Sequence, residues 1–283
     1  MIVMSKKIDL DSCMTAAILL GDNLGDNPLE NIELTDLATL DQLDDANTVC
    51  IECGGSGDIA RSNYDHHYYS SGNIRIDGSE YLPPACIQAA GKKLEEIPPI
   101  VKAIGKWDEG NADEFPEFRE IQKVFSGMLL SIKDAKEQAI AGIKLCQKWL
   151  KGDFLLSPEE EKWVERREQY DDQIENELEK VEFVDSMSDR TIAYVESPFW
   201  GTLREVQKRL DDDDIVIVRN PEKGKITVAL NPQNSGDLKG ICDLLNKIDP
   251  GWGGPITGKI IGSPQKGSRL TLHDVVQVVR LFM

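Results

Sequence analysis

Strand-like and helix-like segments alternate over the first part of the chain, and this alternation limits its fold more than any other feature. Short apolar segments typical of strands lie at residues 1–5, 31–37, 47–57 and 62–67. Helical patterns lie at residues 11–23, 82–97 and 98–111. Strands that alternate with helices form a parallel sheet with helices on both faces. We therefore expect an α/β fold with a parallel sheet in the N-terminal part.

The middle of the chain is helical. Residues 131–152 form one predicted helix, and residues 157–184 form a longer one that opens with a capping box of Ser157 and Glu160. Apolar residues of the longer helix follow helical spacing at Trp163, Tyr170, Ile174, Leu178 and Val181. Such a stripe is more typical of core packing than of a cofactor site.

A polar segment without apolar periodicity, residues 185–190, precedes a second α/β pattern. Strands are predicted there at residues 191–197, 214–220, 224–230 and 256–263, and helices at residues 201–210, 237–248 and 271–282. The acidic run at residues 211–214 is expected to be a solvated turn. The pattern predicts two domains: residues 1–185, with a helical C-terminal extension, and a smaller C-terminal α/β domain of residues 191–283.

The net charge is −18, from 32 Lys and Arg residues against 50 Asp and Glu residues. Charge of this sign repels polyanions at long range, so the sequence argues against a protein that binds long duplex nucleic acid. No apolar run approaches a membrane span, and the N-terminal segment lacks the apolar region of a signal peptide. We expect a cytoplasmic protein without a membrane partner, and a homodimer remains compatible with the sequence.

The six cysteines are scattered along 283 residues, and we expect free thiols. "CIEC", from Cys50 to Cys53, resembles half of a zinc site, but no second CxxC or nearby pair of histidines completes it. Packing of a buried strand is the favoured interpretation.

Acidic side chains and two adjacent histidines follow the predicted strands at their carboxyl ends. Asp9 and Asp11 point to one side of an extended chain, and they also precede a helix that Asp11 or Ser12 would cap. Glu52 ends a buried strand, where an acid is costly unless it is paired or metal-bound. In an open parallel sheet, ligands gather at the carboxyl ends of the strands. One edge is therefore expected to collect Asp9, Asp11, Glu52, Asp65, His66 and His67.

Carboxylates combined with imidazole form the kind of site that suits manganese, magnesium or zinc. His66 is the candidate imidazole ligand. Two adjacent histidines in a loop are as often simply exposed, but their combination with the Asp9–Asp11 pair and Glu52 favours a metal site.

In order along the chain come "DLDS" after the first strand, an acid that ends a later strand, "DHH", and Asp108 in "GKWDEGNAD". This ordered set resembles the DHH phosphoesterase superfamily, which includes single-strand exonucleases, oligoribonucleotide and cyclic-dinucleotide phosphodiesterases, and manganese pyrophosphatases. The resemblance spans the chain, because "GWGGPITGKIIGSP" is similar to the glycine-rich signature of the DHH-associated C-terminal domain.

The resemblance implies that Asp9 and Glu52 face a first metal, while Asp11, Glu52, His66 and Asp108 surround a second. Mn²⁺ is the expected cation, with Mg²⁺ or Zn²⁺ as alternatives. His67 would support the site, and Asp65 would orient a histidine. Two cations about 3.5–4 Å apart would activate a hydroxide for in-line attack on phosphorus. The implied catalytic residues are Asp9, Asp11, His66 and His67.

The chain departs from the family pattern at several positions. Relatives have a histidine two or four residues before the first aspartate, where this chain has Lys7 and Ser5. Glu52 replaces an aspartate and adds about 1.5 Å of reach, and Pro255 stands where a histidine is usual. The first metal keeps only two candidate ligands, so partial occupancy is expected. Lys7 would supply fixed positive charge for an anion or form an ordinary salt bridge.

Phosphate contacts are expected from two places. The glycine turn at residues 54–57 would either hold an anion or serve only as a turn. Lys259, Lys266 and Arg269 form a local basic cluster, which the resemblance places over the substrate and which ordinary surface charge also explains. His273 is expected to be structural.

Two functions follow from these features. The first is metal-dependent hydrolysis of a small phosphodiester or phosphoanhydride by a metal-bound hydroxide, with a small phosphate-containing substrate or a short oligonucleotide. The alternative is a catalytically inactive protein of the same fold that binds a nucleotide or phosphate and regulates. Processing of long nucleic acids is a third and weaker hypothesis, which the net charge disfavours.

Overall fold

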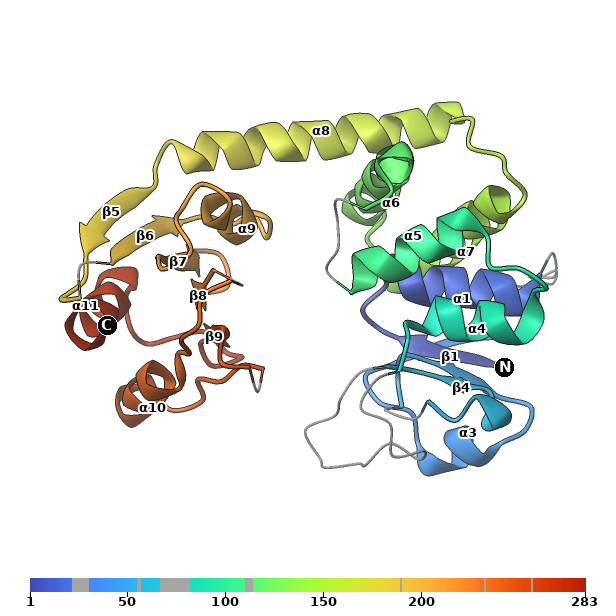
Figure 1. Ribbon diagram of the computed structural model, residues 1–283, viewed down its shortest axis with the longest axis horizontal. Coiled ribbons are helices and arrows are strands. Elements are labelled where there is room, and N and C mark those ends of the chain that lie inside the picture. The colour runs from blue at the N-terminus through green and yellow to red at the C-terminus, as the bar shows by residue number, and fades with distance from the viewer. Residues whose placement is uncertain are drawn as a thin grey trace. The chain divides into compact units, whose positions relative to one another are not determined.

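The computed structural model describes residues 1–21, 31–54, 57–66, 82–109, 114–188, 190–231, 233–255 and 257–283. Contacts between residues group the chain into two compact units, Met1–Glu168 and Gln169–Met283. This division lies within helix α8 (Pro158–Leu178), whereas the sequence pattern places its boundary after that helix. Each unit contains its own sheet (Figure 1).

The first unit contains a four-stranded sheet in the order β2-β1-β3-β4. Its strands are β1 (Ile2–Ser5), β2 (Ile32–Thr35), β3 (Val49–Ile51) and β4 (Asn63–Tyr64). Every pairing in it is parallel, which confirms the predicted parallel sheet. The carboxyl ends of β1, β3 and β4 therefore meet at one edge.

Alternating side chains of this sheet enter two different cores. Ile2, Met4 and Ile51 belong to the large core beneath helices α1 (Leu10–Leu20), α4 (Ala85–Lys93) and α7 (Ala135–Leu150). Val3 and Cys50 point the other way and pack with Ala38 and Cys53, on the side where α3 (Leu40–Asp44) lies (Figure 1). Helices thus cover both faces, as predicted.

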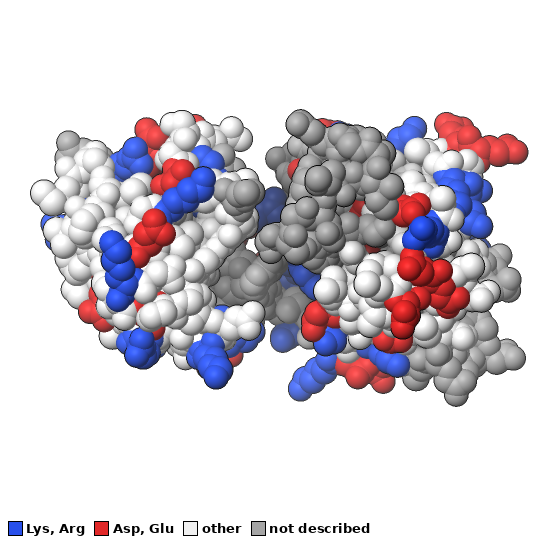
Figure 2. Space-filling model, turned by 90° about the horizontal axis from the view of Figure 1, so that it is seen from below, with Lys and Arg blue, Asp and Glu red and all other residues white. Residues whose placement is uncertain are grey.

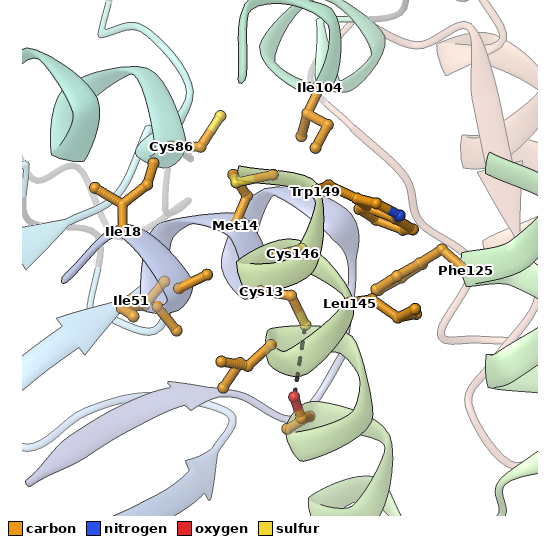
Figure 3. Close-up of a cluster of buried hydrophobic side chains, with 14 of the residues drawn as sticks. Cys13, Met14, Ile18, Ile51, Cys86, Ile104, Phe125, Leu145, Cys146 and Trp149 are labelled. Atoms are coloured by element: carbon orange, nitrogen blue, oxygen red, sulfur yellow. Dashed lines mark hydrogen bonds between the residues drawn. The ribbon is translucent and has the colours of Figure 1, made fainter. Parts of the chain in front are cut away.

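The centre of the large core is formed by small and sulfur-containing side chains of α1 packed against α7 (Figure 3). Cys13 and Met14 are fully buried there beside Cys146 and Trp149. The Cys13 thiol points at the carbonyl of Ala139, at 4.0 Å. All six cysteines are free thiols, as predicted, and the pair in "CIEC" packs in a core.

Helices α5 (Pro99–Asp108) and α6 (Arg119–Ser131) complete the large core. The sequence pattern does not indicate α6 or α3. It also merges residues 131–134 with α7, although the chain ends α6 at Ser131 and caps α7 with Asp134. The Asp134 side chain accepts a hydrogen bond from the backbone N–H of Glu137, and this contact defines the break.

The second unit contains a mixed five-stranded sheet in the order β5-β6-β7-β8-β9, in which only the β6–β7 pair is parallel. Its strands are β5 (Glu182–Asp185), β6 (Thr191–Glu196), β7 (Ile215–Asn220), β8 (Lys225–Leu230) and β9 (Ile260–Gly262). Its helices are α9 (Thr202–Gln207), α10 (Lys239–Ile248) and α11 (Leu272–Phe282). The parallel sheet with its helices in the first unit, and the second sheet with its own helices, confirm the predicted α/β fold class.

Alternation again divides the side chains of this second sheet. Ile215 and Ile217 face a core that includes residues of α10 and α11. Val216 and Val218 face a core that includes Ile174 of α8 and residues of α9. The acidic run forms the turn before β7, in which Asp214 accepts a hydrogen bond from the backbone N–H of Asp211.

The long predicted helix of residues 157–184 is corrected by the structure. Its capping box is present, since Ser157 and Glu160 exchange hydrogen bonds. The helix ends at Leu178, however, and residues 182–185 form β5, which pairs antiparallel with β6. In "EFVD", Phe183 is exposed while Val184 packs against the core, an alternation that suits an edge strand. The apolar stripe is core packing: Trp163 packs in the first unit and Ile174 in the second.

The start of α1 is a second correction. The helix begins at Leu10, and its N-cap is Asp9, not Asp11 or Ser12. Asp9 has an extended backbone, and its side chain accepts a hydrogen bond from the backbone N–H of Ser12. Asp11 and Ser12 therefore lie in the first helical turn.

No helix in the described ranges combines the length and the apolar character that a transmembrane span requires. Basic and acidic side chains are mixed over the described surface that Figure 2 shows.

Two glycines test how closely the helices of the first unit pack. A Cβ atom built on Gly127 of α6 would lie 1.8 Å from the backbone oxygen of Trp163, whereas one on Gly91 of α4 would meet nothing within 4 Å. Gly127→Ala should lower the free energy of unfolding by roughly 1–3 kcal/mol. Gly91→Ala should raise it by up to about 1 kcal/mol, because alanine favours a helix. Denaturant unfolding of both variants measures the difference, and equal effects would contradict this packing.

Candidate metal centre

Asp11 lies in the first turn of α1 and is 1% exposed. Its two carboxylate oxygens accept hydrogen bonds from the backbone N–H groups of Ala85 and Cys86, each at 2.8 Å. These are the first two residues of α4, whose N-cap position is Pro84 and has no side-chain cap of its own. Asp11 thus caps α4 from another helix, and the N-terminus of α4 stabilises its negative charge.

Glu52 follows β3 at the edge of the sheet. Its backbone is in the left-handed region, with φ of 51°, which is uncommon for a residue other than glycine and is frequent at functional sites. Its N–H donates to the carbonyl of Tyr64 at 2.8 Å, so the neighbouring strand β4 holds this conformation. The carboxylate faces two ways: Oε2 lies 2.6 Å from the Ser12 hydroxyl, and Oε1 lies 3.2 Å from His66 Nε2.

His66 comes two residues after β4, and Asp108 is the last residue of α5. His66 Nε2 lies 2.9 Å from Asp108 Oδ2. The two side chains are 16% and 23% exposed, against 2% for the Glu52 side chain. The buried carboxylates thus form the floor of the site, and His66 and Asp108 border solvent.

Asp11, Glu52, His66 and Asp108 each place one ligand atom within 4.8 Å of the others. Ligand atoms on opposite sides of a Mg²⁺-sized ion lie about 4.2 Å apart, so small side-chain rotations would close the group around one cation. Three carboxylates and one imidazole are ligands that manganese, magnesium and zinc accept. The residues present therefore fit a divalent cation.

The acids of the site are buried and close together, and both conditions shift their pKa values. Burial, followed by the charge of Glu52, raises the pKa of Asp9 to about 7, and the same two causes raise the pKa of Asp11 well above its ordinary value. Burial alone would lower the pKa of His66, but hydrogen bonds with Asp108 and Glu52 outweigh it and raise the pKa to about 10. Without a metal, a proton on His66 supplies the positive charge that the carboxylates require.

Asp9 lies beside this group and contacts it through Ser12. Asp9 Oδ1 accepts from the backbone N–H of Ser12 at 2.9 Å and lies 2.7 Å from its hydroxyl oxygen. That hydroxyl is the one that also contacts Glu52, and Ser12 is fully buried. A hydroxyl has one hydrogen, so both short contacts are satisfied when one of the two acids is protonated, which agrees with the raised pKa of Asp9.

Other residues predicted for this edge have different surroundings. Lys7 is exposed, and its backbone N–H donates to the side chain of Ser5. Asp65 accepts a hydrogen bond from the backbone N–H of Gly54 at 3.2 Å and so helps to hold the turn after β3. The predicted site residue His67 and part of the glycine turn, residues 55–56, lie outside the described residues.

The basic residues predicted to bind substrate lie in the second unit. Lys259 donates through Nζ to the carbonyls of Asn234 and Gly236, and Arg269 donates to the buried carboxylate of Asp249 at 3.0 Å. Lys266 is exposed. Two of the three cations therefore hold loops of their own unit together. His273 is also exposed, at the start of α11.

Sequence reasoning missed the role of Ser12, which it considered only as a helix cap. The available signal was its position three residues after Asp9, because an N-cap side chain and the residue three positions later commonly exchange hydrogen bonds. Its second contact, with Glu52 forty positions along the chain, arises only from the fold.

The raised pKa values predict how stability depends on pH in the presence of chelator. Because folding raises these pKa values, the folded chain binds protons more tightly, and its stability falls as pH rises from 3.8 to about 7 for Asp9 and from 6.5 to about 10 for His66. Asp9→Asn keeps a good N-cap and removes one titrating group, so it should weaken the fall in melting temperature below pH 7 and leave the fall above pH 7. Melting curves from pH 5 to 9 test this, and parallel profiles for both proteins would contradict it.

No family model and no curated protein sequence matches the chain. The solved structures that are similar to it across nearly its whole length include two with TM-scores above 0.5. The pGpG-specific phosphodiesterase PggH from Vibrio cholerae has a TM-score of 0.58 at 12% identity, with 98% of both chains covered. The DHH domain of a member of a family of ribosomal proteins has a TM-score of 0.51 at 12% identity, covering 98% of this chain and 85% of that one.

At such low identity these similarities concern the fold alone. They extend over both units of the chain, and one of the two structures is named for its DHH domain. The chain shares its fold with PggH and with this DHH domain.

Proposed function

We propose that this chain is a divalent-cation-dependent phosphohydrolase that acts on a small phosphodiester or phosphoanhydride. The observation that supports it is the convergence of Asp11, Glu52, His66 and Asp108 from four separate segments to within 4.8 Å. Buried carboxylates are costly in a protein interior, and a cluster of them that also includes an imidazole is typical of a metal site.

The chain fixes each of these side chains differently. Backbone N–H groups hold both oxygens of Asp11, so its remaining lone pairs have a set direction. The Ser12 hydroxyl holds one oxygen of Glu52 and leaves the other facing His66. His66 and Asp108 are the more exposed members, so a substrate would approach from their side.

A divalent cation held by these residues would stabilise negative charge on the phosphoryl oxygens, which is the main requirement of phosphoryl transfer. Mn²⁺ is the cation we propose, and Mg²⁺ and Zn²⁺ have the same ligand preferences here. His66 must be neutral at Nε2 to bind it, so cation binding displaces the proton that the imidazole otherwise holds.

A small substrate is favoured over a long one. With a net charge of −18, the chain repels long polyanions at a distance, while a cation attracts a phosphate group at close range. PggH, which shares the fold, is named for its activity on pGpG. A linear dinucleotide is therefore the first substrate to test, followed by other short oligoribonucleotides, cyclic dinucleotides and pyrophosphate.

A second candidate function is a non-catalytic nucleotide- or phosphate-binding protein. It is favoured by Ser5 and Lys7, which stand where the family resemblance expects a histidine, and by the exposed position of Lys7. Such a protein would show a higher melting temperature with a nucleotide and no turnover.

The two candidates separate in one assay. The chain, freed of metal with chelator, is incubated with each substrate and Mn²⁺, and products are resolved by chromatography. We expect cleavage of at least one substrate and none in chelator. His66→Ala should lower the rate by about 100-fold or more, because it removes a proposed ligand.

His273→Ala is the matched control, since it removes an exposed imidazole from the second unit and should leave the rate unchanged. Failure to cleave any substrate, with no effect of chelator, would reject the enzymatic function. A rate that survives His66→Ala would reject this site.

A further inference from the structure

Ser12 lies between two carboxylates that the family resemblance assigns to a first metal. Its hydroxyl oxygen is 2.7 Å from Asp9 Oδ1 and 2.6 Å from Glu52 Oε2. The residue is fully buried in the first turn of α1. One hydroxyl therefore links Asp9 to Glu52 at hydrogen-bond distance from both.

We propose that Ser12 is a positioning residue that joins Asp9 to Glu52 in place of a first metal, so that the chain holds one divalent cation and not two. The cation is the one bound by Asp11, Glu52, His66 and Asp108, and this inference rests on that part of the proposed function. The Ser12 side chain hydrogen-bonds to Glu52, one of these four ligands, and acts on the cation through it.

Asp9 and Glu52 each already have other contacts. Asp9 Oδ1 is the N-cap acceptor of α1 and receives the backbone N–H of Ser12 at 2.9 Å besides the hydroxyl contact. Glu52 directs Oε2 to the same hydroxyl and Oε1 to His66, so each of its oxygens already faces another side chain. Across the described ranges, the structure holds one group of metal-ligating side chains, and Asp9 is not among its members.

The residues upstream of Asp9 support the same conclusion. Ser5 ends β1, and its side chain accepts the backbone N–H of Lys7 at 3.2 Å, so both residues form the turn that leaves the strand. Lys7 is exposed, and neither residue is a nitrogen donor like the histidine that the resemblance expects. A first cation would have too few ligands here, whereas the four-residue group is complete for one.

Longer reach explains why Glu52 serves in this arrangement. Glutamate has one methylene more than aspartate, about 1.5 Å of extra length. From a left-handed backbone at the end of β3, its carboxylate spans from Ser12 to His66. The Ser12 hydroxyl holds Oε2 in place, and Oε1 is left to bind the cation.

The experiment is Mn²⁺ binding by isothermal titration calorimetry, without substrate, with metal content measured in parallel. We expect one Mn²⁺ per chain. Two would overturn the inference while leaving the proposed function possible, and none would reject the cation site itself. Because turnover is not measured, the result does not depend on finding the right substrate.

Ser12→Ala tests the positioning role. It keeps the backbone N–H that Asp9 caps and removes only the hydroxyl, so the helix start is preserved. We expect one Mn²⁺ per chain with a dissociation constant about tenfold larger, the usual effect of losing a group that orients a ligand. An unchanged dissociation constant would overturn this role.

Thr15→Val is the matched control for Ser12→Ala. Thr15 is a buried hydroxyl residue one turn further along α1, and it donates to the backbone carbonyl of Asp11 and not to a carboxylate. Its loss should leave Mn²⁺ affinity unchanged. Equal weakening by both substitutions would indicate a general loss of helix stability and would overturn the proposal.

Discussion

The concentration of buried negative charge at the carboxyl ends of β1, β3 and β4 is the constraint that shapes the first unit of the chain. Asp11 and Glu52 are 1% and 5% exposed, and Asp108 lies beside them. Carboxylates removed from water must be protonated, hydrogen-bonded or paired with a cation. The structure supplies hydrogen bonds through the helix N-terminus and Ser12, and a positive charge through a protonated His66. A divalent cation would supply that positive charge instead and displace the proton.

The fold brings these groups together from far apart in the sequence. Parallel pairing aligns the ends of three strands, and the α4 N-terminus meets Asp11 there. The left-handed backbone of Glu52 turns its side chain to the same place while Cys50 and Cys53 pack together in the smaller core. The site thus depends on sheet register and helix packing, and less on its own loops, which is the arrangement that keeps ligands in fixed positions.

Much of this could be predicted from the sequence, because strand alternation and the order of acids and histidines are local patterns. The parallel sheet and the convergence of Asp11, Glu52 and His66 followed from the rule that ligands gather at strand ends, whereas Asp108, at the end of helix α5, was expected there only from the family resemblance. Three features could not be predicted, because tertiary contacts decide them. Residues 182–185 left the helical pattern to pair with β6, α6 was not recognised, and Ser12 acquired a partner distant in sequence. The substrate-binding role of Lys259 and Arg269 also could not be judged from charge alone, since their partners are carbonyls and a buried acid of the same unit.

The central proposal is that four side chains of the first unit share one divalent cation. The most direct test is anomalous scattering at the manganese edge, measured on crystals grown with Mn²⁺. We expect a single strong anomalous peak within bonding distance of Asp11, Glu52, His66 and Asp108, with Ser12 still joining Asp9 to Glu52. A peak elsewhere, or crystals in which these four side chains surround no anomalous scatterer, would contradict the proposed site.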